Sequence, residues 1–179
     1  MSDVARASQA LDGCLRGLPT QVFIGLGSNM HDPKRQLRRA IDALGQLPLT
    51  QLRRVSQFYA NPPMGPQQQP DYVNAVAELG TRLAPLSLLT ELQCIEFRHG
   101  RRSGLRWGQR CLDLDLLLYD HQQIEHLRLR VPHPGIADRA FVLVPLAELQ
   151  PGLEIPGVGR VDTLLRSVAD VDSVVVCEP

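Results

Sequence analysis

Residues 111–119 read CLDLDLLLY, and this stretch indicates more about the fold than any other in the chain. Because successive side chains of a β-strand point to opposite faces, the four leucines at even positions are predicted to face the core. Asp113 and Asp115 then share the other face, with α-carbons roughly 7 Å apart. Aspartate is uncommon in strands, and two on one face repel each other unless a cation lies between them. The pair is therefore a candidate magnesium site, since Mg²⁺ prefers oxygen ligands from one or two carboxylates and from phosphates. The alternative is an exposed strand face with two hydrated acids.

The regions around this strand are predicted to alternate between strands and helices. Asp32 and Pro33 are typical of a helix N-cap followed by the first helical residue, and Gly45 should end that helix. Further helices are expected at residues 84–97, 138–149 and 161–169. The other strands are expected at residues 21–25, 52–60, 72–83 and 173–177. The order β-α-β-β-α-β predicts an α+β fold of the ferredoxin-like type. In that fold an antiparallel sheet has helices packed on one face, and here extra C-terminal helices follow.

Composition narrows the classes of function. The 179 residues contain 19 basic and 19 acidic side chains, so the zero net charge disfavours a general nucleic-acid binder. No apolar run approaches the roughly 20 residues of a membrane span. Four scattered cysteines without a CxxC pair fit a reducing compartment. We expect a cytoplasmic protein with residues 1–20 as a partly mobile N-terminal extension and residues 21–179 as a single domain.

The segment directly before the aspartate pair is strongly basic. Residues 98–110 contain five arginines, no acid and three glycines, so this loop is expected to move and to bind an anion. Mobile arginines beside a metal pair suit nucleotide phosphates, because they supply charge and exclude water. The alternative is an ordinary charged loop that is hydrated and binds no ligand. Trp107, the only tryptophan, lies within this loop and is expected to contact a ligand or form part of a lid.

Two further motifs point to a flat ligand. Tyr72 and Asn74 are predicted to share one strand face, where a ring and a carboxamide can stack on a heterocycle and read its edge; an ordinary exposed pair is the alternative. Gly25-Leu26-Gly27 lacks the third glycine of a dinucleotide motif, because Met30 stands there. Those glycines are expected to let the backbone pack closely.

These features together resemble the 6-hydroxymethyl-7,8-dihydropterin pyrophosphokinase family of folate biosynthesis. The matching segments occur in family order between Val22 and Leu149. They are 24–29 (IGLGSN), 56–59, 61–65, 69–75 (QPDYVNA), 106–115 (RWGQRCLDLD), 131–133 (VPH), Arg139 and Phe141.

The resemblance implies that pyrophosphate passes from ATP to the pterin hydroxymethyl group and that AMP is released. Asp113 and Asp115 would hold two Mg²⁺ ions, and with them the implied catalytic residues are Arg101, Arg102 and Arg110. The implied pterin-binding residues are Asn61, Pro62, Pro63, Met64, Tyr72, Asn74, Trp107 and Phe141. The implied nucleotide-binding residues are Gln93, Glu96, Arg110, Leu116, Arg128, Arg130, His133 and Arg139. The expected partners are ATP and 6-hydroxymethyl-7,8-dihydropterin, with neither nucleic acid nor membrane, and a monomer is expected.

Other functions remain open at this point. A two-metal transferase with another acceptor would keep the metal and arginine parts but would not explain Tyr72, Asn74 and Phe141 together. An RNA-binding module predicts aromatic strands and a basic sheet face, whereas aromatic residues make up only 4% of this chain. A pterin-binding paralogue with weak activity would be expected to have lost Asp113, Asp115 or His133.

Overall fold

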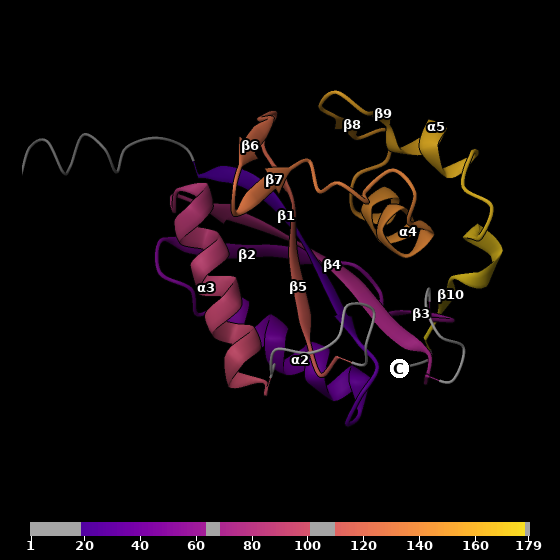
Figure 1. Cartoon of the computed structure of the whole chain (residues 1–179), viewed down its shortest axis with the longest axis horizontal. Coiled ribbons are helices and arrows are strands. Elements are labelled where there is room, and N and C mark those ends of the chain that lie inside the picture. Colours follow the sequence, from indigo (N-terminus) through magenta and orange to yellow (C-terminus); the bar gives the residue numbers. More distant parts are fainter. Residues whose placement is uncertain (1–18, 64–68, 101–109, 178–179) are drawn as a thin grey trace, which may run out of the picture.

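The computed structural model describes residues 19–63, 69–100 and 110–177, and a six-stranded sheet runs through its centre (Figure 1). Its strands are β1 (Thr20–Ser28), β2 (Thr50–Val55), β3 (Tyr59–Asn61), β4 (Tyr72–Thr81), β5 (Asp113–Tyr119) and β10 (Val175–Val176). The strand order is β10-β3-β4-β1-β5, and β2 also pairs with β4. Every pairing in this sheet is antiparallel, so the chain is an α+β protein with an antiparallel sheet, as predicted.

The expected strand at residues 52–60 is in fact two strands, β2 and β3, which lie along the same edge of β4. The break between them stays attached to β4 at Ser56. Ser56 N donates to Val76 O at 2.9 Å, and Val76 N donates to the Ser56 hydroxyl at 3.0 Å. A side chain thus replaces one backbone partner, and the chain can bend without leaving a buried amide unpaired.

Helices α2 (Pro33–Leu44) and α3 (Pro85–Arg98) cover one face of the sheet. The Asp32 side chain accepts a hydrogen bond from Arg35 N at 3.2 Å and Pro33 follows it, so the predicted N-cap is confirmed. Leu37 and Leu44 of α2 are fully buried against the apolar side chains of β1, β4 and β5. This side of the sheet is the main hydrophobic core.

Helix α4 (Ala140–Leu149) packs on the opposite face of the sheet (Figure 1). Leu143 and Leu146 are fully buried there against Phe23 and Val76. The expectation of helices packed on one face therefore holds for α2 and α3, whereas α4 divides the second face into a covered part and a part that carries the site.

Strand β5 contains an irregularity that the alternation of its leucines did not predict. The register with β1 shifts between Phe23, which pairs with Leu118, and Ile24, which pairs with Leu116. One extra residue in β5 turns Leu118 toward α4, where it packs beside Leu117. The prediction that all four even leucines face one core is therefore wrong for Leu118.

Smaller elements complete the described chain. They are the hairpin β6 (Ile124–His126) and β7 (Leu129–Val131), the hairpin β8 (Glu154–Ile155) and β9 (Gly159–Arg160), helix α5 (Val161–Leu165) and the 3₁₀ turn η1 (Val171–Ser173). Both hairpins were missed from the sequence, and α5 is shorter than the helix expected at residues 161–169. No helix in the described ranges is long and apolar enough to cross a membrane.

Candidate active site

A cavity of about 260 Å³ lies on the sheet face that carries α4. Strands β1, β4 and β5 form its floor and the first turn of α4 forms one wall. Nine of the residues predicted from the sequence line it: Asn61, Pro63, Tyr72, Asn74, Arg110, Asp113, Asp115, Arg139 and Phe141. The fold therefore brings together predicted site residues that are up to 80 positions apart in the sequence.

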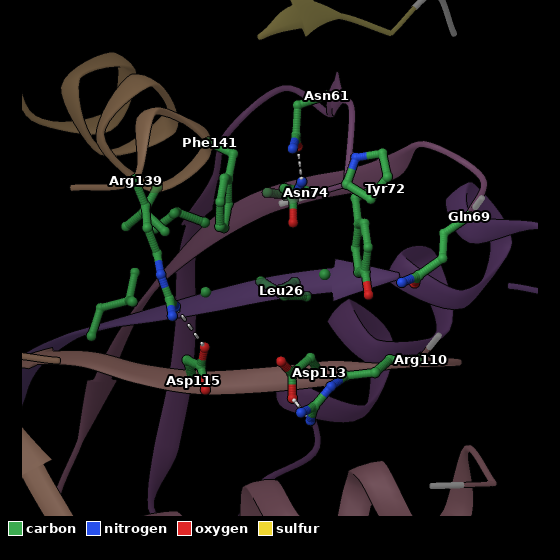
Figure 2. A pocket seen from close by; sticks show the side chains of 17 residues that line it. Leu26, Asn61, Gln69, Tyr72, Asn74, Arg110, Asp113, Asp115, Arg139 and Phe141 are labelled. Atoms are coloured by element: carbon green, nitrogen blue, oxygen red, sulfur yellow. Dashed lines mark hydrogen bonds and ion pairs between the residues drawn. The ribbon is translucent and has the colours of Figure 1, made fainter. Parts of the chain in front are cut away.

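Two aromatic rings bound one part of this cavity. Figure 2 shows Tyr72, from the start of β4, and Phe141, from α4, on opposite sides of Asn74. Both rings are partly exposed to the cavity. Burial raises the pKa of Tyr72, so its hydroxyl stays protonated around neutral pH. The space between the rings is a slot suited to a flat heterocycle.

Glycine makes room for the polar group at the base of this slot. Gly27 of β1 pairs with Asn74 of β4, and a β-carbon at position 27 would lie 2.9 Å from Asn74 Oδ1. An alanine there would push the carboxamide out of place. The expectation that these glycines permit close packing is therefore confirmed for Gly27.

The two aspartates share one face of β5 and point into the same cavity (Figure 2). Asp113 pairs with Gly27 and Asp115 with Gly25 of β1, so no side chain of the neighbouring strand covers either carboxylate. Arg110 Nη1 donates to Asp113 Oδ1 at 2.9 Å. The predicted common face is confirmed.

The electrostatics of Asp115 favour a cation beside it. Burial and the nearby Asp113 carboxylate raise the pKa of Asp115, while His133 and Arg139 act in the opposite direction. His133 Nε2 lies 3.8 Å and Arg139 Nη1 lies 3.9 Å from Asp115 Oδ2. Burial lowers the pKa of His133, although Asp115 opposes this shift. A half-buried pair of carboxylates suits a divalent cation, because the cation cancels their repulsion.

The donor set fits magnesium bound together with a phosphate ligand. Within the described residues, no group of three or more histidine, cysteine, aspartate or glutamate side chains could form a complete protein cage. Two carboxylates leave coordination positions that water and phosphate oxygens can fill, which is the usual arrangement for Mg²⁺ at phosphoryl-transfer sites.

Several predicted site residues lie away from the cavity lining. Glu96 is buried beneath β5, where its Oε1 accepts from Leu114 N at 2.8 Å, and Gln93 is exposed on α3. Leu116 packs in the core under α2 and α3, and its neighbour Leu117 lines the cavity instead. Pro62 is exposed beside the lining residue Pro63.

The remaining predicted nucleotide residues lie near the hairpin β6–β7. Arg128 and Arg130 are exposed there, and Arg130 forms an ion pair of 2.7 Å with Glu125. His133 lies beside Asp115, outside the lining of the cavity. Met64, Arg101, Arg102 and Trp107 lie outside the described residues.

Sequence reasoning missed other contributors to the site. Gln69, Leu117 and Val142 line the cavity, and Asn29 hydrogen-bonds the segments around it. Asn29 and Gln69 belong to the segments IGLGSN and QPDYVNA, so a search for polar residues at strand ends could have found both. Leu117 follows Asp113 and Asp115 at the next odd position of β5, so strand alternation alone could have placed it on the site face.

Fold and cavity together define an α+β enzyme with a slot for a flat polar ring next to a carboxylate pair and arginines. Residues 23–151 match the model of the 7,8-dihydro-6-hydroxymethylpterin-pyrophosphokinase (HPPK) family. The chain belongs to this family and is thus a pyrophosphokinase, an ATP-dependent transferase.

Two bacterial relatives are similar over most of the chain. Both are called 2-amino-4-hydroxy-6-hydroxymethyldihydropteridine pyrophosphokinase. The Pseudomonas aeruginosa protein is 49% identical over 147 residues, which cover 82% of this chain and 91% of that protein. The Haemophilus influenzae protein is 48% identical over 148 residues, which cover 83% and 92%.

The structure is also similar to solved HPPK-DHPS structures. One from Plasmodium falciparum, wild type with SDX-DHP, has a TM-score of 0.62 at 14% identity. The match covers 83% of this chain but only 43% of that longer chain. A second, HPPK-DHPS in complex with substrates, has a TM-score of 0.67 at 11% identity. At such identities the likeness shows the fold alone.

Proposed function

We propose that this protein transfers the pyrophosphoryl group of ATP to the hydroxymethyl oxygen of 6-hydroxymethyl-7,8-dihydropterin, giving AMP and the pterin diphosphate in folate biosynthesis. The observation that carries the proposal is a single cavity that combines two functions. An aromatic slot with a carboxamide lies in the same cavity as a carboxylate pair flanked by arginines. The activity named for the similar bacterial proteins needs both parts.

The ring of the acceptor would lie between Tyr72 and Phe141, which offer two apolar faces to it. Asn74 would hydrogen-bond its polar edge, and Pro63 with Asn61 would close the end of the slot. In this orientation the hydroxymethyl group would extend toward Asp113 and Asp115. Met64 and Trp107 are retained as pterin contacts on the resemblance alone.

Asp113 and Asp115 would hold two Mg²⁺ ions, which when bound neutralise phosphate charge and align the reacting oxygens. Arg110 and Arg139 line the same cavity and would bind phosphate oxygens. His133 lies beside Asp115 and would bind phosphate from there. Arg101 and Arg102 would add charge from the loop, and Arg128 with Arg130 would approach the nucleotide from the β6–β7 hairpin.

The reaction forms one bond and breaks one bond. The hydroxymethyl oxygen bonds to the β-phosphorus of ATP, and the bond from that phosphorus to the oxygen shared with the α-phosphate breaks. AMP leaves with the shared oxygen, and the hydroxyl proton passes to water. Asp113 and Asp115 are the only carboxylates among the described lining residues, so no separate base is assigned. Positioning and charge neutralisation carry such transfers.

The direct test is AMP release from ATP and Mg²⁺, with and without 6-hydroxymethyl-7,8-dihydropterin. Pterin-dependent AMP without ADP supports the proposal. ADP in place of AMP would mean transfer of a single phosphoryl group. No AMP from folded protein that binds the dihydropterin would indicate a weakly active paralogue, and no binding at all would indicate another acceptor.

The finer fold class and assembly state belong to the same proposal. The core strands follow the order β2-β4-β1-β5 with α2 and α3 on one face, which supports the ferredoxin-like assignment. A monomer is expected, and light scattering after size-exclusion chromatography would test it.

A further inference from the structure

Asn61 ends β3 at the rim of the cavity and is 94% buried, because only 6% of its surface is exposed. Its pairing partner in β4 is Tyr72, and its side chain points along the sheet toward Asn74, as Figure 2 shows. Asn74 is 5% exposed. Two carboxamides therefore meet in a place from which bulk water is largely excluded.

The orientation of the Asn61 amide is fixed by a backbone group. Asn61 Nδ2 donates to the carbonyl oxygen of Pro62 at 2.7 Å. A backbone carbonyl can only accept, so the nitrogen of Asn61 must face Pro62 and its oxygen must face the other way. That oxygen accepts from Asn74 Nδ2 at 2.5 Å.

The same reasoning fixes Asn74. Its nitrogen is engaged by Asn61, so its oxygen lies on the opposite side of the amide, which Figure 2 shows. Asn74 also lines the cavity. The two hydrogen bonds that link Pro62, Asn61 and Asn74 thus leave the Asn74 oxygen as an acceptor. This acceptor lies at the base of the slot between the two aromatic rings.

We propose that Asn61 is a positioning residue that holds Asn74 with its oxygen toward the ligand, so that the slot selects rings with a donor edge. This inference rests on the proposed function and names the part of the acceptor that is read: an N–H or amino group on the ring edge. Without Asn61 the Asn74 amide could rotate and present its nitrogen to the ligand, which would leave two donors facing each other.

Kinetics give the first test. Asn61→Ala should raise the KM for the dihydropterin about 10-fold, the usual size of one lost hydrogen bond at a buried site. The KM for ATP should stay unchanged. Asn61→Asp keeps an acceptor toward Asn74 but cannot donate to Pro62. Its pterin KM should rise less than that of Asn61→Ala although its Tm falls further. If Asn61 had only a structural role, the variant with the lower Tm would also have the higher pterin KM. That result would overturn the proposal.

The second test repeats the Asn61→Ala substitution in a protein that already carries Asn74→Asp, where the expected change in the pterin KM has the opposite sign. In an Asn74→Asp protein both side-chain oxygens accept, so one of them faces the Asn61 oxygen and repels it. Adding Asn61→Ala there should lower the pterin KM, whereas it raises the KM in the wild type. Equal changes in the two backgrounds would show that Asn61 does not act through Asn74. Gln122→Ala, an exposed amide on the turn after β5, serves as the control.

Nuclear magnetic resonance tests the orientation without any substrate. In the ligand-free protein the Asn74 side-chain amide, assigned by its loss in Asn74→Asp, should exchange slowly with solvent and should speed up in Asn61→Ala. If exchange does not change, the inference fails even where the enzyme is active. If exchange changes but the wild type neither binds the dihydropterin nor releases AMP, the proposed function fails instead.

Discussion

Asn29 and Arg110 exchange two hydrogen bonds across the base of the site. Arg110 N donates to Asn29 Oδ1 at 2.9 Å, and Asn29 N donates to Arg110 O at 3.1 Å. Asn29 Nδ2 also donates to Pro70 O at 3.3 Å. Asn29 is nearly fully buried. One carboxamide thus joins the segment that leads into Asp113 to the segment that leads into Tyr72.

Replacing Asn29 should therefore disturb both halves of the site. Asn29→Ala removes all side-chain bonds and should raise the KM for ATP and for the dihydropterin together, each about 10-fold. Asn29→Asp keeps the acceptor for Arg110 N but loses the donor to Pro70 O, so the pterin KM should rise more than the ATP KM. Steady-state kinetics with each substrate varied in turn measure this, and a change confined to ATP in both variants would contradict the linkage.

The carboxylate pair should be essential for turnover and costly for stability. Asp113→Asn or Asp115→Asn should lower kcat at least about 100-fold, since loss of groups that only support metal ligands already costs 10–100-fold. Burial and the neighbouring Asp113 carboxylate both raise the pKa of Asp115, so removing one of the two charges relieves an unfavourable interaction, and the Tm measured without Mg²⁺ should stay equal or rise. Mg²⁺ should raise the Tm of the wild type with bound ATP analogue more than that of either variant. A variant with unimpaired kcat would rule out the assignment.

The aromatic slot should govern only the acceptor. Phe141→Ala and Tyr72→Ala each remove one wall and should raise the pterin KM about 10-fold, because a stacked ring contributes roughly 0.5–1.5 kcal/mol beyond its buried area. The ATP KM should change little. Phe141→Leu keeps an apolar surface without the ring face and should lie between the wild type and Phe141→Ala. An equal rise in the KM for ATP and in the KM for the dihydropterin would argue against a slot specific for the ring.

Glu78 should make stability sensitive to acid. It is buried in β4 and accepts from Gln21 Nε2 at 2.9 Å and from Arg54 Nε at 2.7 Å. Burial alone would raise the pKa of Glu78, but hydrogen bonds from Gln21, Arg54 and Arg53 outweigh it and the pKa is lowered. The folded state therefore favours the ionised carboxylate. Its contribution is complete above the pKa of the unfolded chain and is lost as the pH falls through the lower folded pKa.

Thermal melts of the wild type and of Glu78→Gln across a range of pH test whether the stabilisation by Glu78 is lost in acid. The wild type should have the higher Tm at neutral pH. The gap should begin to narrow near the ordinary glutamate pKa of about 4.3 and should close once the pH falls below the lower pKa of Glu78 in the folded protein. Gln51→Ala, at an exposed position of β2, provides a matched control that should follow the wild type at every pH. A gap that widens in acid would mean that Glu78 is protonated in the folded protein.

Much of the site could be predicted because strand alternation is a local rule. The shared face of Asp113 and Asp115, and that of Tyr72 and Asn74, needed only the sequence of two strands. The position of α4 could not be predicted in this way, because an apolar helix face does not indicate which side of a sheet it will cover. Glu96 shows the same limit, since its partner Leu114 N is a backbone group that no side-chain pattern reports.

Strands β4 and β5 hold mainly core residues on one face and site residues on the other where the register is regular, although Ala75 of β4 belongs to the core and also borders the cavity. A substitution at one position changes a single property, but the loss of one residue near Val73 would exchange the two sets. Asn74 would then enter the core, and its carboxamide would no longer face the cavity. During evolution, β4 and β5 of this protein should accordingly tolerate many substitutions but very few insertions or deletions.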